Sequence, residues 1–126
     1  MKTIFQNIFP IALVILLFTG FSSSVAAQGK SGDSKQQTIS LKVFGVCGDC
    51  KQRIESTALD VKGVKKAEWD MQSDVLVLIG TKKMSKEKVA AALAKAGHRS
   101  ELLAADPKGY ANLPACCQYD SGVNKH

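Results

Sequence analysis

The chain has 126 residues, a formal net charge of +6 and only 6% aromatic residues. A chain of this length fits one domain with a modest core, which excludes a multidomain enzyme. Its lysines are scattered, with no arginine-rich run and no interleaved aromatic residues, which is only a weak indication of nucleic-acid binding, so we predict no nucleic-acid partner.

The N-terminus has the pattern of a secretory signal peptide. Lys2 precedes an apolar run from Ile8 to Phe18, and small residues follow up to Ala27. Because the apolar run is too short for a stable transmembrane anchor, we predict a signal peptide over 1–27 and no stable membrane insertion after its removal. The predicted location is the periplasm of a bacterium. A retained signal anchor is the alternative.

The folded part is predicted to begin after a polar leader. Residues 28–36 are small and polar, which is typical of a flexible segment. From Thr38 to Val43 apolar and polar residues alternate, which predicts a half-buried strand. Beyond Gly45 the period changes to that of a helix, which we expect to end at Gly63. The apolar residues at helical spacing are Cys50, Ile54, Ala58 and Val61.

Two further strands follow the first helix. The second opens at Val64, and in it Ala67, Trp69 and Met71 alternate with charged residues. The segment 75–79 is apolar on both faces, which predicts a central strand of the sheet.

A second helix is predicted between Ser85 as N-cap and Gly97 as C-terminal cap. Its apolar stripe consists of Val89, Ala92, Leu93 and Ala96. Residues 99–103 are predicted as a last edge strand. This order of elements predicts an α+β, ferredoxin-like βαββαβ sandwich over 37–103, with a four-stranded antiparallel sheet and two helices on one face.

Cys47 and Cys50 lie where the first strand meets the first helix. One helical turn brings both sulfurs to the same side of an exposed loop, where they can bind one ion. The helix N-terminus and the nearby Lys51 and Arg53 favour the thiolate form. Sulfur donors without a histidine or carboxylate cluster select soft ions, so we predict Cu(I), with Hg(II), Zn(II) or Cd(II) as alternatives.

Other roles for a Cys-x-x-C pair remain open. A zinc ribbon needs a second spaced pair, whereas Cys116 and Cys117 are adjacent. The alternative from another class is a thiol-disulfide oxidoreductase, with Cys47 as nucleophile and Cys50 as resolving thiol. Val46 stands where thioredoxin-type enzymes usually have Trp, and no Pro lies within the motif. A permanent disulfide between the two cysteines is a third possibility.

Three segments together resemble the heavy-metal-associated domain. They are the G-V-C-G-D-C run over 45–50, Gly63-Val64 before the second strand, and Ala96-Gly97-His98 before the last one. The resemblance covers about 37–103 and implies a metal-binding protein without catalytic turnover, such as a copper chaperone or a periplasmic mercury-binding protein. It also implies a partner, a metal-transporting ATPase or efflux component whose acidic docking face would complement the lysines.

The resemblance extends to two positions around the loop. The family's usual lead-in is Gly-Met-Thr-Cys, in which Met packs beneath the loop, whereas this chain has Phe44, Gly45 and Val46 before the first cysteine. We expect Phe44 to fill that space. His98 matches a loop that faces the metal, so the resemblance implies a possible additional ligand there. The alternative is a solvent-exposed histidine after a helix cap.

The tail, 104–126, has no clear periodicity but carries Cys116 and Cys117. The stretch from Leu103 to Cys116 can span up to about 40 Å, enough to return to the metal loop. Three roles for the pair stay open: additional metal ligands, disulfides with the loop cysteines, or a separate second site. The apolar and aromatic residues of the tail are expected to pack on the domain; they are Tyr110, Leu113 and Tyr119.

Overall fold

The computed structural model describes residues 35–126. The predicted signal peptide (1–27) and nearly all of the predicted leader (28–36) lie outside these residues. The elements, in chain order, are β1 (Gln37–Lys42), α2 (Gly48–Leu59), β2 (Val64–Asp70), β3 (Val75–Gly80), α3 (Lys86–Lys95), α4 (Pro107–Ala111) and the 3-10 helix η2 (Ala115–Cys117). Within residues 35–126 no helix combines the length and hydropathy needed to cross a bilayer.

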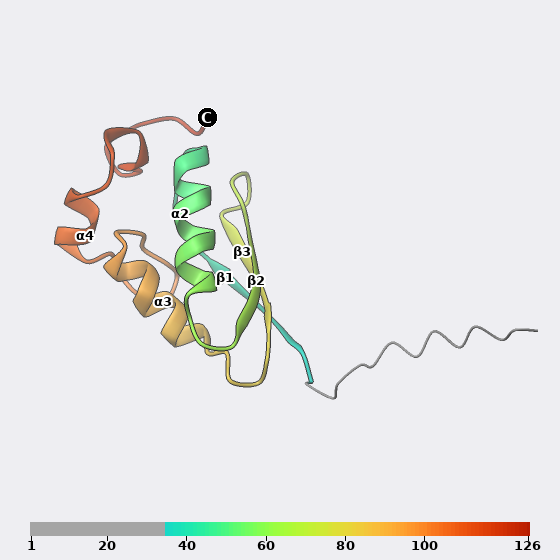
Figure 1. Ribbon diagram of the computed structural model, residues 1–126. Coiled ribbons are helices and arrows are strands. Elements are labelled where there is room, and N and C mark those ends of the chain that lie inside the picture. Colours follow the sequence, from blue (N-terminus) through green and yellow to red (C-terminus); the bar gives the residue numbers. More distant parts are fainter. Residues whose placement is uncertain (1–34) are drawn as a thin grey trace, which may run out of the picture. The chain divides into compact units, whose positions relative to one another are not determined.

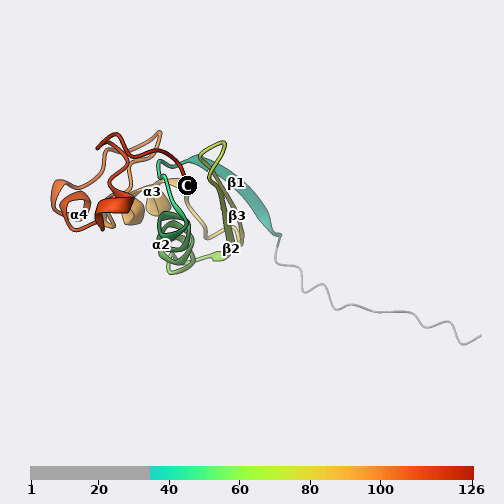
Figure 2. The same ribbon diagram turned by 90° about the horizontal axis from the view of Figure 1, so that it is seen from above.

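The sheet has three antiparallel strands in the order β1-β3-β2. The apolar strand β3 is central, as predicted, and both Leu41 and Trp69 pair with Leu76 across it. Helices α2 and α3 cover one face of this sheet (Figures 1 and 2). The predicted ferredoxin-like α+β fold is therefore confirmed.

The fourth strand of the prediction is not formed. In place of a strand over 99–103, the chain makes one isolated antiparallel bridge, between Val43 and Ser100. The hydroxyl of Ser100 accepts hydrogen bonds from the backbone N–H groups of Leu102 and Leu103. This local bonding competes with the sheet ladder and turns the chain away, so the predicted four-stranded sheet is wrong in its last strand.

Trp69 of β2 is fully buried and connects three elements. Its Nε1 donates to the carbonyl of Val43 at 2.9 Å, beyond the end of β1. Its backbone N–H donates to Glu55 Oε1 at 2.8 Å, and Lys51 Nζ donates to its carbonyl at 2.6 Å, both from α2. These bonds fix the start of α2 against the sheet.

The indole of Trp69 also lies beneath the cysteine loop. A Cβ added at Gly45 would lie 3.0 Å from Cβ of Cys50 and 3.0 Å from Cη2 of Trp69. Because Gly45 has no side chain, the indole of Trp69 can pack directly against its backbone. Phe44 is half-buried instead, with the guanidinium carbon of Arg99 4.3 Å from its ring centroid, so the expectation that Phe44 fills this space is wrong.

The second helix has the caps that the sequence predicts. The Ser85 hydroxyl accepts the backbone N–H of Lys88, and Gly97 has a positive φ of 96°. A side chain at Gly97 would collide with the backbone of Gly109 in α4. Two glycines thus allow the first element of the tail to pack closely on the end of α3.

Replacing Gly45 with Ala tests the packing beneath the loop. We expect Gly45→Ala to lower the free energy of unfolding by about 1–3 kcal/mol, because the new methyl group overpacks the contact with the indole. Gly48→Ala is the matched control, since a Cβ there has nothing within 4 Å. Urea unfolding of both variants measures the difference, and a Gly45→Ala protein as stable as the wild type would contradict this account.

Candidate metal centre

The site begins at the N-terminus of α2. Cys47 is the N-cap, with extended backbone angles, and its sulfur accepts the backbone N–H of Cys50 at 3.4 Å. Cys50 lies on the buried face of the helix together with Ile54 and Ala58. The helical spacing therefore brings the two sulfurs together, as predicted, but both side chains are buried, so the expectation of an exposed loop is wrong.

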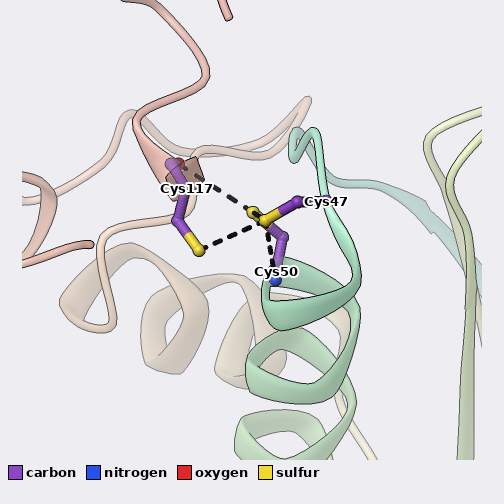
Figure 3. A group of neighbouring side chains, drawn as sticks. All are labelled: Cys47, Cys50 and Cys117. Carbon is purple, nitrogen blue, oxygen red and sulfur yellow. Dashed lines mark hydrogen bonds between the residues drawn. The ribbon is translucent and has the colours of Figure 1, made fainter. Parts of the chain in front are cut away.

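The tail supplies a third sulfur to this loop. Cys117 in η2 has its Sγ 3.4 Å from Sγ of Cys47, which in turn lies 3.2 Å from Sγ of Cys50. All three sulfurs lie within 4.8 Å of one another and point to a common centre (Figure 3). We call Cys47, Cys50 and Cys117 the inner cluster.

The inner cluster is shielded from solvent. Cys47 is 3% exposed, and Cys50 and Cys117 are 0% exposed. Cys116 is partly exposed, with its Sγ 3.9 Å from that of Cys117 and 3.7 Å from Oδ2 of Asp49. Asp49, Cys116 and Cys117 form a second group of possible ligand atoms within 4.8 Å of one another. All four cysteines are free thiols.

The three inner thiols differ in acidity. Burial raises the pKa of Cys47, but hydrogen bonds from the backbone N–H of Cys50 and from the thiols of Cys50 and Cys117 outweigh it, so its pKa is lowered. Burial raises the pKa of Cys50 and that of Cys117, and at Cys117 the hydrogen bonds with the thiols of Cys47 and Cys50 raise it further. Cys47 is therefore the sulfur that carries the negative charge most readily.

Lys51, one of the two cations near the loop, has partners other than the cysteines. Lys51 is engaged by the carbonyl of Trp69 and by Glu55 Oε1, at 2.6 and 2.7 Å. Hydrogen bonds are the main interactions that lower the pKa of Cys47, and the contribution expected of Lys51 and Arg53 stays a prediction. The contribution expected of the helix N-terminus is present, through the N–H of Cys50.

His98 lies outside both groups of converging ligand atoms. It is fully buried, and its Nδ1 is 3.0 Å from the carbonyl oxygen of Phe44. Burial lowers its pKa, which keeps the ring neutral. The alternative of a solvent-exposed histidine is therefore wrong. The third group beside Cys47 and Cys50 is Cys117 and not His98, and the role of His98 as an additional ligand stays a prediction.

Tyr119 holds the tail against the domain. Its hydroxyl donates to the carbonyl of Gly97 and accepts the backbone N–H of Arg99, both at 2.9 Å. Its ring stacks on His98, with the centroids 5.8 Å apart. The predicted packing of the tail is therefore present, and Leu113 is buried with it.

The end of the chain also returns to the cysteine loop. The backbone N–H of His126 donates to the carbonyl of Val46 at 2.8 Å. Lys125 forms an ion pair with Asp74 at 2.9 Å and donates to the carbonyl of Met71. The tail thus borders the loop on both sides of η2, with its end near the start of α2 (Figure 1).

A ferredoxin-like fold with clustered thiols at the first strand-to-helix turn defines a small soft-metal-binding domain. Residues 40–99 match the heavy-metal-associated domain family, and this part of the chain belongs to that family. The tail that supplies Cys117 lies beyond the matched residues. Among curated protein sequences none matches the chain.

Several solved structures are similar to this one. A Bacillus anthracis protein assigned as copper-ion-binding has 18% identity and a TM-score of 0.50, over 54% of this chain and 99% of that one, and supports the fold. Oxidised MerP from Ralstonia metallidurans has 29% identity and a TM-score of 0.49, over 52% and 94%. The CopZ metallochaperone has 23% identity and a TM-score of 0.49, over 51% and 98%.

The sequence did not indicate how the tail meets the loop. It left open three roles for Cys116 and Cys117, and the structure separates the two: Cys117 joins the inner cluster, whereas Cys116 faces Asp49. Two features of the sequence bear on the return of the tail. Asp106-Pro107 marks the start of a helix, and Gly97 and Gly109 allow that helix to pack closely on the end of α3. Their spacing alone does not reveal the contact.

Removing the Tyr119 hydroxyl tests the attachment of the tail. We expect Tyr119→Phe to leave the Arg99 N–H without a partner and to lower the free energy of unfolding by about 1–3 kcal/mol. Alkylation of Cys117 should also become faster. Tyr110→Phe is the control, because its hydroxyl accepts one exposed hydrogen bond, from Asp120. Equal unfolding and alkylation in both variants would refute the role of Tyr119.

Proposed function

We propose that this protein takes up Cu(I) and retains it with Cys47, Cys50 and Cys117. The observation that supports this proposal is the convergence of three buried sulfurs, two from the family's metal loop and one from the tail. Three thiolates without a nearby histidine or carboxylate in the same group favour a soft ion. Hg(II), Zn(II) and Cd(II) are the competing ions.

The spacing of the sulfurs suits a single ion. Metal–sulfur bonds of about 2.3 Å place three ligand sulfurs about 4 Å apart around a common centre. The observed separations of 3.2 and 3.4 Å need to widen by about 0.6 to 0.8 Å for this arrangement. Because Cys47 takes part in both separations, small side-chain rotations of Cys47 and Cys117 can supply these movements.

Retention follows from the third sulfur and the burial. A partner that removes the ion must first replace Cys117, which the attached tail holds in place. Burial of Cys47 also argues against the oxidoreductase alternative, since an attacking thiolate must reach its substrate disulfide. We therefore favour a binding protein that sequesters its ion over an enzyme or a rapidly exchanging chaperone.

Serine substitutions test the proposed ligands. In competition with a Cu(I) chelator, Cys47→Ser and Cys50→Ser should abolish tight binding, and Cys117→Ser should weaken it by at least about tenfold, because only two sulfurs remain to hold the ion. Ser121→Ala is the control, since its hydroxyl bonds only the tail carbonyl of Gln118. Unchanged affinity in Cys117→Ser would contradict the three-sulfur site. Insulin reduction at a thioredoxin-like rate would favour the enzyme.

We further propose that the chain is exported to a bacterial periplasm, where it retains its ion until an efflux component with an acidic docking face slowly removes it. The signal-peptide pattern over 1–27 supports export. The net charge supports the docking, since it is +6 for the whole chain and +5 once Lys2 is removed with residues 1–27. N-terminal sequencing of the exported protein should begin at Gln28, and copper transfer to such a component should slow with added salt. A protein retained in the cytoplasm with residues 1–27 attached would contradict export.

A further inference from the structure

The inner cluster needs a path by which an ion reaches it. Ligand exchange requires the incoming thiolate to approach an ion that is still bound to its donor, and the inner sulfurs are almost fully buried. Cys116 is the one cysteine within residues 35–126 that is partly exposed. A donor that carries a soft ion can therefore meet Cys116 while the inner cluster stays covered.

The four sulfurs form a continuous series from the surface to the interior. Sγ of Cys116 lies 3.9 Å from that of Cys117, which lies 3.4 Å from that of Cys47, which lies 3.2 Å from that of Cys50. Each separation is no greater than the about 4 Å between two sulfurs bound to one ion. Neighbouring sulfurs can therefore share an ion at every step inward.

Asp49 gives the outer end of this series a second donor. Its side chain is exposed at the first turn of α2, and its Oδ2 accepts a hydrogen bond from the Cys116 thiol at 3.7 Å. Asp49 also lines a surface hollow with Gln52, Arg53 and Ser56 of the same helix, which leaves space for a donor beside Cys116. The outer group of one carboxylate and two sulfurs holds a soft ion less tightly than three sulfurs.

We propose that Cys116 and Asp49 form an intake site, from which Cys117 passes the ion to Cys47 and Cys50. This inference rests on the proposed function. A thiolate of Cys116 binds the ion as one donor ligand leaves, and Cys117 then displaces the last donor ligand. Cys47 and Cys50 bind next, and Cys116 is released. Each thiol gives its proton to solvent on binding, Cys116 regains one on release, and the ion stays Cu(I) throughout.

The rate of copper uptake tests the intake site. The reduced protein is mixed with the coloured Cu(I)–bicinchoninate complex, and the loss of colour gives both the rate and the final occupancy. We expect Cys116→Ser to slow uptake by at least about tenfold while it reaches the wild-type occupancy of one ion. Ala115→Ser is the matched control, because it adds a hydroxyl to the exposed neighbour without removing a thiol.

The outcomes separate this inference from the proposed function. Uptake by Cys116→Ser at the rate of Ala115→Ser would overturn the intake site while final occupancy still supports the inner cluster. Two ions in the wild type and one in Cys116→Ser would also overturn it, since the outer group would then be a storage site. Failure of the wild type to take copper from the complex would refute the proposed function and the intake site together.

Discussion

The site depends on the indole of Trp69 beneath the cysteine loop. Its hydrogen bond to the carbonyl of Val43 and its contact with Gly45 fix the turn between β1 and α2 from the inside. Because the strand-to-helix turn cannot sink further into the core, Cys47 stays at the N-cap of α2. A single buried ring thus sets the positions of the two loop sulfurs, and the tail is built around them.

The tail changes what a heavy-metal-associated domain can do. The matched family segment ends at residue 99, yet Tyr119 and the packed glycines of α3 and α4 return the chain to the loop. This adds Cys117 as a third sulfur and removes the loop from solvent. The tighter retention and slower exchange that we propose rest on these same contacts, and so does the proposed intake role of Cys116.

Residue patterns predicted most of the fold and two of the three sulfurs of the inner cluster, those of Cys47 and Cys50. Alternation in β1 and β2, the apolar run of β3 and the caps Ser85 and Gly97 depend on local periodicity, which sequence shows directly. The edge strand failed because the Ser100 hydroxyl competes for backbone N–H groups. The third sulfur could not be chosen, because the return of the tail depends on long-range packing of Tyr119 that has no period.

X-ray absorption of the copper-loaded protein tests the central claim most directly, because it counts the sulfurs around the ion. The three-sulfur site predicts three Cu–S bonds in the wild-type protein and two in Cys117→Ser, with copper remaining Cu(I) in both. Two Cu–S bonds in the wild type, unchanged by the substitution, would contradict the account and leave the tail as a cover without a ligand.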